Sequence, residues 1–100
     1  MEFIEDFFIG KSVMDLRGIL ADLRRGVAVP RVYCIVYFED RGRLELLSSR
    51  ELLHARNRSR PAKVAGIAMG RGEAIELLGF MARTAWESGR DCANPQEWIL

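Results

Sequence analysis

The stretch from residue 61 to residue 74 constrains the fold of this chain more than any other. Residues 62–68 form a short apolar run typical of a buried strand, and a helical pattern begins soon afterwards. Gly70 and Gly72 interrupt the chain between the two, as expected where the backbone bends sharply. The sequence therefore predicts a strand that leads through a tight corner into a helix.

Such a corner can hold an anion, because the first backbone N–H groups of a helix have no partner within it. Arg71 adds a cation between Gly70 and Gly72, whereas Glu73 offers a carboxylate to the same helix end. The glycine spacing matches neither the dinucleotide-binding pattern nor the phosphate-loop pattern. We expect a structural turn here, with an anion site at Gly70, Arg71 and Gly72 as the less favoured interpretation.

Two further strands are predicted before this corner. Residues 31–38 (RVYCIVYF) are dense in β-branched and aromatic residues on both faces, which is typical of an inner strand covered on both sides. A turn at 39–42 leads to residues 43–47, which fit the return strand of a hairpin. A short helix capped by Ser48 or Ser49 then leads toward the third strand.

Two longer helices complete the pattern. Apolar residues recur at helical spacing between Ser12, a candidate N-cap, and Gly26. A second helix is predicted from about residue 71 to residue 88, ending at Gly89. Residues 90–100 form a tail in which Asn94 and the proline after it start a final turn.

The amino-terminal segment, residues 1–11, is apolar but ambiguous. Phe3 and Phe7 are four residues apart, as are Ile4 and Phe8, and this spacing suits a short helix without excluding a strand. The fold class is α+β, a small mixed α/β domain over residues 1–100 with a roughly three-stranded sheet. A hairpin is joined to the third strand by a short helix, other helices pack on the sheet, and the order is α-β-β-α-β-α.

Charge is nearly balanced over the whole chain, with 15 basic and 14 acidic residues. This balance argues against an electrostatic footprint for nucleic acid over the whole domain. The basic side chains nevertheless concentrate between Arg50 and Lys63, where Arg56, Arg58 and Arg60 alternate with other residues. Arginines spaced in this way could each reach a phosphate, although no aromatic residue is interleaved to stack on bases. Binding of phosphate or nucleic acid through this loop is therefore possible but not favoured.

Residues with catalytic or metal-binding chemistry are few. His54 is the only histidine, and neither a Ser/His/Asp nor a Cys/His arrangement is evident near it. Cys34 and Cys92 show no local pairing of the kind that zinc sites use. We therefore predict no catalytic residues, no metal and no cofactor, and the interpretation leans away from an enzyme.

Apolar side chains suggest a different role. A helical wheel at about 100° per residue predicts a buried arc of the helix over 71–88 that includes Ile75 and Trp86. Phe80 falls in the opposite, polar stripe of that helix, where an aromatic residue needs a cover. The tail, the amino-terminal phenylalanines or another chain could supply it. The candidate interface residues are Phe3, Phe7, Phe8, Phe80 and Trp98. The leading hypothesis is a non-catalytic protein-interaction or regulatory module acting as a homodimer.

The expected compartment is the cytoplasm. No apolar run approaches the roughly 18 residues that a membrane span needs. Residues 1–6 are acidic where a secretory signal would be basic, and we expect no membrane association. In that compartment a disulfide between Cys34 and Cys92 is disfavoured.

Overall fold

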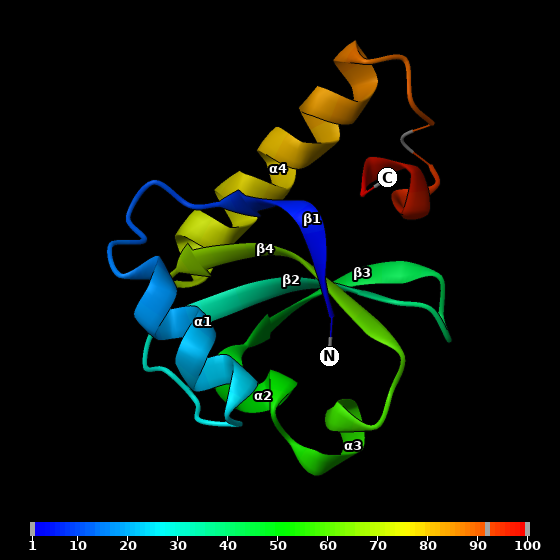
Figure 1. The fold of residues 1–100 in the computed structure, drawn as a ribbon. Coiled ribbons are helices and arrows are strands. Elements are labelled where there is room, and N and C mark those ends of the chain that lie inside the picture. The colour runs from blue at the N-terminus through cyan, green and yellow to red at the C-terminus, as the bar shows by residue number, and fades with distance from the viewer. Residues whose placement is uncertain (1, 92, 100) are drawn as a thin grey trace.

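The computed structural model describes residues 2–91 and 93–99, and its centre is a mixed sheet of four strands (Figure 1). The strands are β1 (Glu2–Ile9), β2 (Val32–Phe38), β3 (Arg43–Ser48) and β4 (Ala62–Met69). They lie in the order β1-β4-β2-β3. β2 is antiparallel to both of its neighbours, and β1 runs parallel to β4 at one edge of the sheet.

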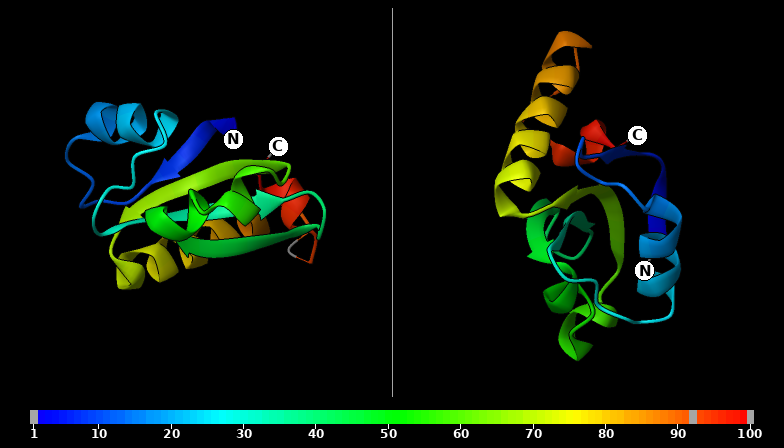
Figure 2. Two further views of the ribbon diagram at one scale, coloured as in Figure 1. Left: turned by 90° about the horizontal axis from the view of Figure 1, so that it is seen from below. Right: turned by 90° about the vertical axis from the view of Figure 1, so that its left-hand side faces the viewer.

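Helices cover both faces of this sheet. α1 (Leu16–Arg24) and α2 (Ser49–Leu52) pack on one face, and α4 (Arg71–Glu87) packs on the other (Figure 2, left). α3 (Ala55–Arg58) follows α2 in the connection to β4, and a 3-10 helix, η1 (Pro95–Trp98), contacts α4 and β3. The sheet is thus the middle of three layers and separates two apolar clusters.

β2 supplies side chains to both clusters. Val32, Cys34, Val36 and Phe38 belong to the cluster beneath α1, and Ile35 belongs to the cluster beneath α4. All five are at most 1% exposed. Because successive side chains of a strand point to opposite faces, a strand that is apolar on both faces needs cover on both. The predicted inner strand is confirmed.

The amino-terminal segment is a strand, so the prediction of about three strands is wrong by one. Phe3 and Phe7 point to the α1 side of the sheet, whereas Ile4 and Phe8 point to the α4 side. A spacing of four residues equals about one helical turn and also two strand repeats, so it is compatible with either structure. Pairing with β4, which the sequence does not reveal, decides in favour of the strand.

The predicted order α-β-β-α-β-α is wrong at a second place, the connection before β4. Two short helices stand where one was predicted. Ser48 begins α2 through a capping box with Glu51, as the sequence predicted for Ser48 or Ser49. The side chain of His54 then accepts a hydrogen bond from the backbone N–H of Arg56 and begins α3. A histidine cap was not foreseen, because Ser, Thr, Asp and Asn are the common capping residues.

The two longer helices agree with the sequence pattern except at one end. α4 has almost the predicted bounds, and the tail forms the predicted turn, with Asn94 capping η1. α1 begins after Asp15, whose side chain accepts from the backbone N–H of Gly18, and not after Ser12. Ser12 instead donates its backbone N–H to the Glu73 carboxylate.

Within residues 2–91 and 93–99, no helix combines the length and the apolar character that crossing a membrane requires.

Candidate functional site

The outer face of α4 carries large apolar side chains in contact with solvent. Ile75 is 52% exposed and Trp86 is 73% exposed. Residues 75, 79 and 86 share one face of a helix that turns by about 100° per residue, so Gly79 lies between the two apolar side chains. We call Gly72, Ile75, Gly79 and Trp86 the outer face of α4. No residue of the described ranges comes within 4 Å of a Cβ placed at either glycine, so both positions are open there.

The wheel pattern placed Ile75 and Trp86 in the buried arc of this helix, and the structure shows both exposed. The buried residues of α4 are Ala74, Leu77, Met81 and Ala85. Figure 1 shows the C-terminal half of α4, the half that carries Trp86, extending away from the sheet. The direction in which a helix crosses a sheet is set by packing, which the wheel does not contain. Gly79 was the one feature of the sequence that could have indicated an exposed outer face of α4.

Phe80 occupies a different side of α4, toward β1. Its ring centroid lies 6.1 Å from that of Phe8 in an edge-to-face arrangement, yet Phe80 remains 52% exposed. The two rings border an open groove of about 330 Å³. The lining residues are Phe8, Ile9, Gly10, Lys11, Glu73, Glu76, Leu77 and Phe80. The predicted cover by an amino-terminal phenylalanine is therefore present but partial.

The other predicted interface residues are half-buried within the chain itself. Phe3 and Phe7 pack against the cluster beneath α1, with their ring centroids 5.5 Å apart. Phe8 and Trp98 pack against the cluster beneath α4. These four aromatic residues contribute to the core, and of the predicted set Phe80 is the one with more than half of its surface exposed.

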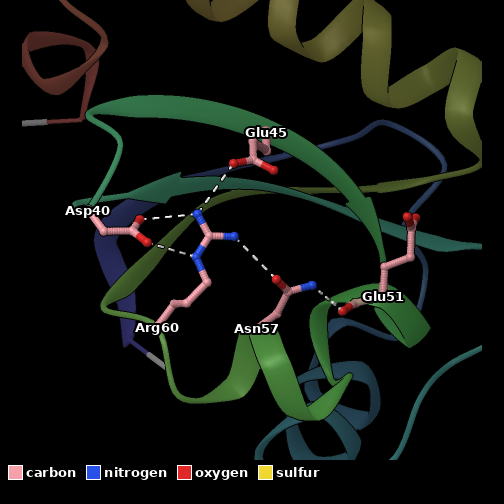
Figure 3. Close-up of polar contacts among 5 residues, drawn as sticks. All are labelled: Asp40, Glu45, Glu51, Asn57 and Arg60. Atoms are coloured by element: carbon pink, nitrogen blue, oxygen red, sulfur yellow. Dashed lines mark hydrogen bonds and ion pairs between the residues drawn. The ribbon is translucent and has the colours of Figure 1, made fainter.

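Arg60 is the centre of a polar network between α3 and the β2–β3 hairpin (Figure 3). Its Nε and Nη2 atoms donate to the two carboxylate oxygens of Asp40 at 3.0 and 3.1 Å, and Nη2 lies 3.5 Å from Oε2 of Glu45. Nη1 donates to Oδ1 of Asn57, whose Nδ2 atom donates to the backbone carbonyl of Glu51. The network therefore links three separate parts of the chain.

The same guanidinium also packs against the core. Its central carbon lies 3.7 Å from the centroid of the Phe38 ring, and the Arg60 side chain is only 18% exposed. The hydrogen bonds from Arg60 lower the pKa of Asp40, and the carboxylate of Asp40 raises the pKa of Arg60. Both groups are thus held in their charged forms by one another.

The remaining predicted phosphate contacts are spread over two elements. Arg56 and Arg58 are exposed on α3. Lys63 lies on β4, where its Nζ atom is 3.7 Å from Oε1 of Glu39. The basic stretch of the sequence is therefore not one continuous surface, because part of it pairs with acidic residues of the hairpin.

A cavity of about 250 Å³ lies beside α3 and brings in an arginine that the sequence did not suggest. Its lining residues are Phe3, Leu23, Arg24, Gly26, Leu52, Asn57, Arg58, Arg60 and Ala62. Three of these are arginines and none is acidic. Arg24 comes from the last turn of α1, and its guanidinium carbon lies 5.5 Å from the centroid of the Phe3 ring. No local pattern in the sequence links Arg24 to Arg58, since the two residues border the same cavity only in the folded chain.

The glycine corner contains its own anion. Gly70 adopts φ of 84°, a backbone conformation that glycine permits, and begins α4 without a side-chain cap. The Glu73 carboxylate accepts hydrogen bonds from the backbone N–H groups of Met69 (2.7 Å) and Ser12 (2.9 Å). These bonds, led by that from Met69, lower the pKa of Glu73. Arg71 and Gly72 are exposed beside this corner.

The two halves of the predicted anion site do not meet. Arg60 precedes β4, whereas Gly70 and Arg71 follow it, so the whole length of the strand separates them. Among residues 2–91 and 93–99, no three side chains of His, Cys, Asp or Glu are placed to hold a metal ion.

Comparison with known proteins adds no relationship to these observations: no protein-family model matches the chain, and neither does any curated protein or solved structure compared with it.

Proposed function

We propose that this chain is a non-catalytic protein-interaction module that acts as a homodimer. The observation that carries the proposal is the exposure of Trp86 and Ile75 on one face of α4. Tryptophan is among the residues most enriched at the energetic centres of interfaces. An exposed pair of large apolar side chains on one helix face is a surface that association would remove from water.

We propose a second copy of this chain as the partner, since self-association needs no other protein. Most oligomers of soluble proteins are symmetric, and two-fold dimers are the commonest, because one patch then serves both subunits. The amino-terminal phenylalanines no longer support the proposal, since they pack within the chain. The argument therefore rests on α4.

The test is the mass in solution measured by light scattering over a range of protein concentrations. We expect twice the mass of one chain at high concentration and dissociation on dilution. A mass of one chain at every concentration, up to the millimolar range, overturns the proposal. Truncation of Trp86 to alanine should shift the equilibrium toward the single chain, whereas truncation of Met14, which is 90% exposed outside α4, should not.

A second candidate function is anion binding at the cavity beside α3. The observation in its favour is the presence of three arginines, and no carboxylate, among the residues that line this cavity. The guanidinium is the side chain best suited to bind phosphate through two parallel hydrogen bonds. Arg60 is already paired with Asp40, so Arg24 and Arg58 are the groups proposed to contact a phosphate, with Arg56 nearby on α3.

Retention on a polyanion column tests this candidate. Binding through phosphate contacts weakens as salt rises, so we expect elution at a defined salt concentration. The double variant Arg24→Ala and Arg58→Ala should elute earlier. A control that changes the exposed Arg17 and Arg43 removes the same net charge from other elements. Equal shifts in the two variants would show a net-charge effect and refute a site at α3.

A further inference from the structure

We infer that the second copy docks antiparallel along α4, with Gly79 at the two-fold axis. This inference rests on the proposed self-association and specifies its geometry. Gly79 is the midpoint of the 17-residue helix and lies at the centre of its outer face. An axis through Gly79 therefore gives the longest overlap that two copies of this helix can form.

Among the residues that the structure describes, none packs against the Cβ position of Gly79. Glycine in a helix interior is less stable than alanine, because its backbone loses more freedom on folding. The fold of residues 2–91 and 93–99 therefore leaves room for alanine at this position. What glycine provides there is close approach of another backbone from outside. Two helices that cross at glycine come closer than the usual interaxial distance of about 8–10 Å.

The antiparallel arrangement places large side chains against small ones. Trp86 and Gly72 are each seven residues from Gly79, so Trp86 of one copy lies level with Gly72 of the other. Helix side chains lean toward the N-terminus of their own helix, which brings Trp86 toward Ile75 of the second copy. The two exposed apolar side chains of each copy thereby cover those of the other, and Gly72 leaves space for the indole.

Charges flanking the outer face are complementary in this arrangement. Arg83 follows Gly79 by four residues and Glu76 precedes it by three, and the helical rotation puts both on the same side of the face. An axis perpendicular to the two helices keeps that side in common, so each Arg83 lies opposite Glu76 of the second copy. Within the described part of the chain neither residue forms an ion pair. A parallel pair in register would instead place Arg83 against Arg83.

The experiment combines light scattering with substitutions on α4. Gly79→Arg inserts a long charged side chain at the axis and should yield single chains at concentrations where the unchanged protein is dimeric. Ala21→Arg is the matched control, since Ala21 is exposed on α1 at the opposite face of the sheet. It should leave the dimer intact, and circular dichroism should show both variants folded.

Charge reversal tests the register. Arg83→Glu alone should raise the dissociation constant by about tenfold, because each copy then opposes Glu76 with a second carboxylate. Adding Glu76→Arg to the same chain should restore the original constant. Gly79→Cys should also form a disulfide-linked dimer on mild oxidation, which Ala21→Cys should not.

The outcomes separate this inference from the proposed function. A dimer that survives Gly79→Arg and does not respond to charge reversal overturns the α4 geometry and leaves self-association standing. A single chain at every concentration in the unchanged protein overturns both. If Gly79→Arg abolishes the dimer but the double charge reversal does not restore the dissociation constant, the outer face of α4 remains the interface and the antiparallel register is rejected.

Discussion

The guanidinium carbon of Arg60 lies 3.7 Å above the centroid of the Phe38 ring. Phe38 is the last residue of β2 and is fully buried, while Arg60 stands at the start of the chain that enters β4. The arginine therefore covers the end of the core and, through Asp40, fixes the hairpin beside it. The sequence suggested that Arg60 contacts a phosphate, whereas in the structure Arg60 stabilises the fold.

We expect Arg60→Ala to lower the midpoint of thermal unfolding by several degrees, because it uncovers Phe38 and leaves Asp40 and Glu45 without their cation. Arg60→Lys should recover little, since an ammonium offers neither the flat stacking surface nor two parallel hydrogen bonds. Differential scanning calorimetry measures both. Arg56→Ala is the control, with an expected change within about 0.5 kcal/mol because Arg56 is exposed. An equal effect of the two alanine variants would contradict the structural role of Arg60.

The stability of the folded chain should fall as the pH is lowered, in part because Glu73 becomes protonated. Hydrogen bonds from Met69 and Ser12 lower its pKa in the folded chain, so its contribution is complete above the ordinary glutamate pKa of about 4.3. That contribution disappears as the pH falls through the lowered folded-state pKa. Glu73→Gln should therefore be less stable at neutral pH and should lose less stability between pH of about 5 and about 3. Urea unfolding as a function of pH measures this.

The lowered pKa of Asp40 acts in the same direction, so some decline with acid should remain in the Glu73 variant. Its size can be judged from Asp40→Asn, which removes the other carboxylate. Parallel stability curves for the unchanged protein and Glu73→Gln would show that the corner makes no pH-dependent contribution.

How far the sequence predicts this fold depends on how local the signal is. β2, its hairpin partner and the corner before α4 were all predicted, because each has a dense run of apolar residues bounded by turn residues. β1 was not, because its phenylalanine spacing fits two periods and its partner lies more than fifty residues away in the chain. The pairing of an edge strand with a distant strand cannot be recognised from the local sequence.

The candidate sites show the same division. The sequence identified Phe80 as misplaced in a polar stripe, and the structure leaves that residue half exposed. It did not identify Trp86, because the wheel assumes that a sheet lies under the full length of the helix. Nor could it show that Arg60, and not Arg56 or Arg58, pairs with Asp40, since that choice depends on how α3 meets the hairpin.

Cys34 should be almost inert toward thiol reagents in the folded chain. It is completely buried in β2 as a free thiol, and burial raises its pKa to about 12. Relative to an ordinary thiol, its thiolate fraction at neutral pH is then lower by about 10³-fold. Cys92, which lies outside the described residues, is changed to serine so that one thiol is followed. We expect labelling by Ellman's reagent at the rate of unfolding, and rapid labelling in urea. Rapid labelling without denaturant would contradict the burial.

Gly66 should resist replacement by a larger residue. It lies in β4 between two layers, and a Cβ there would be 3.3 Å from both Ile35 Cδ1 and Leu77 Cδ2. These distances are tighter than ordinary contacts, so the sheet and α4 would have to separate to admit valine. We expect Gly66→Val to destabilise the fold by about 1–3 kcal/mol, measured by urea unfolding.

Gly79→Ala is the control for that prediction. Both changes enlarge a glycine, but Gly66 lies in β4 beneath α4, whereas Gly79 lies on the exposed side of α4. At a concentration low enough to keep the chain single, Gly79→Ala should stabilise the fold by about 0.5–1 kcal/mol, since alanine favours the helix and the added methyl group meets nothing. Opposite signs for the two substitutions are the expected result. If Gly66→Val were as stable as the unchanged chain, α4 would have to rest farther from β4 than the contacts of Leu77 place it.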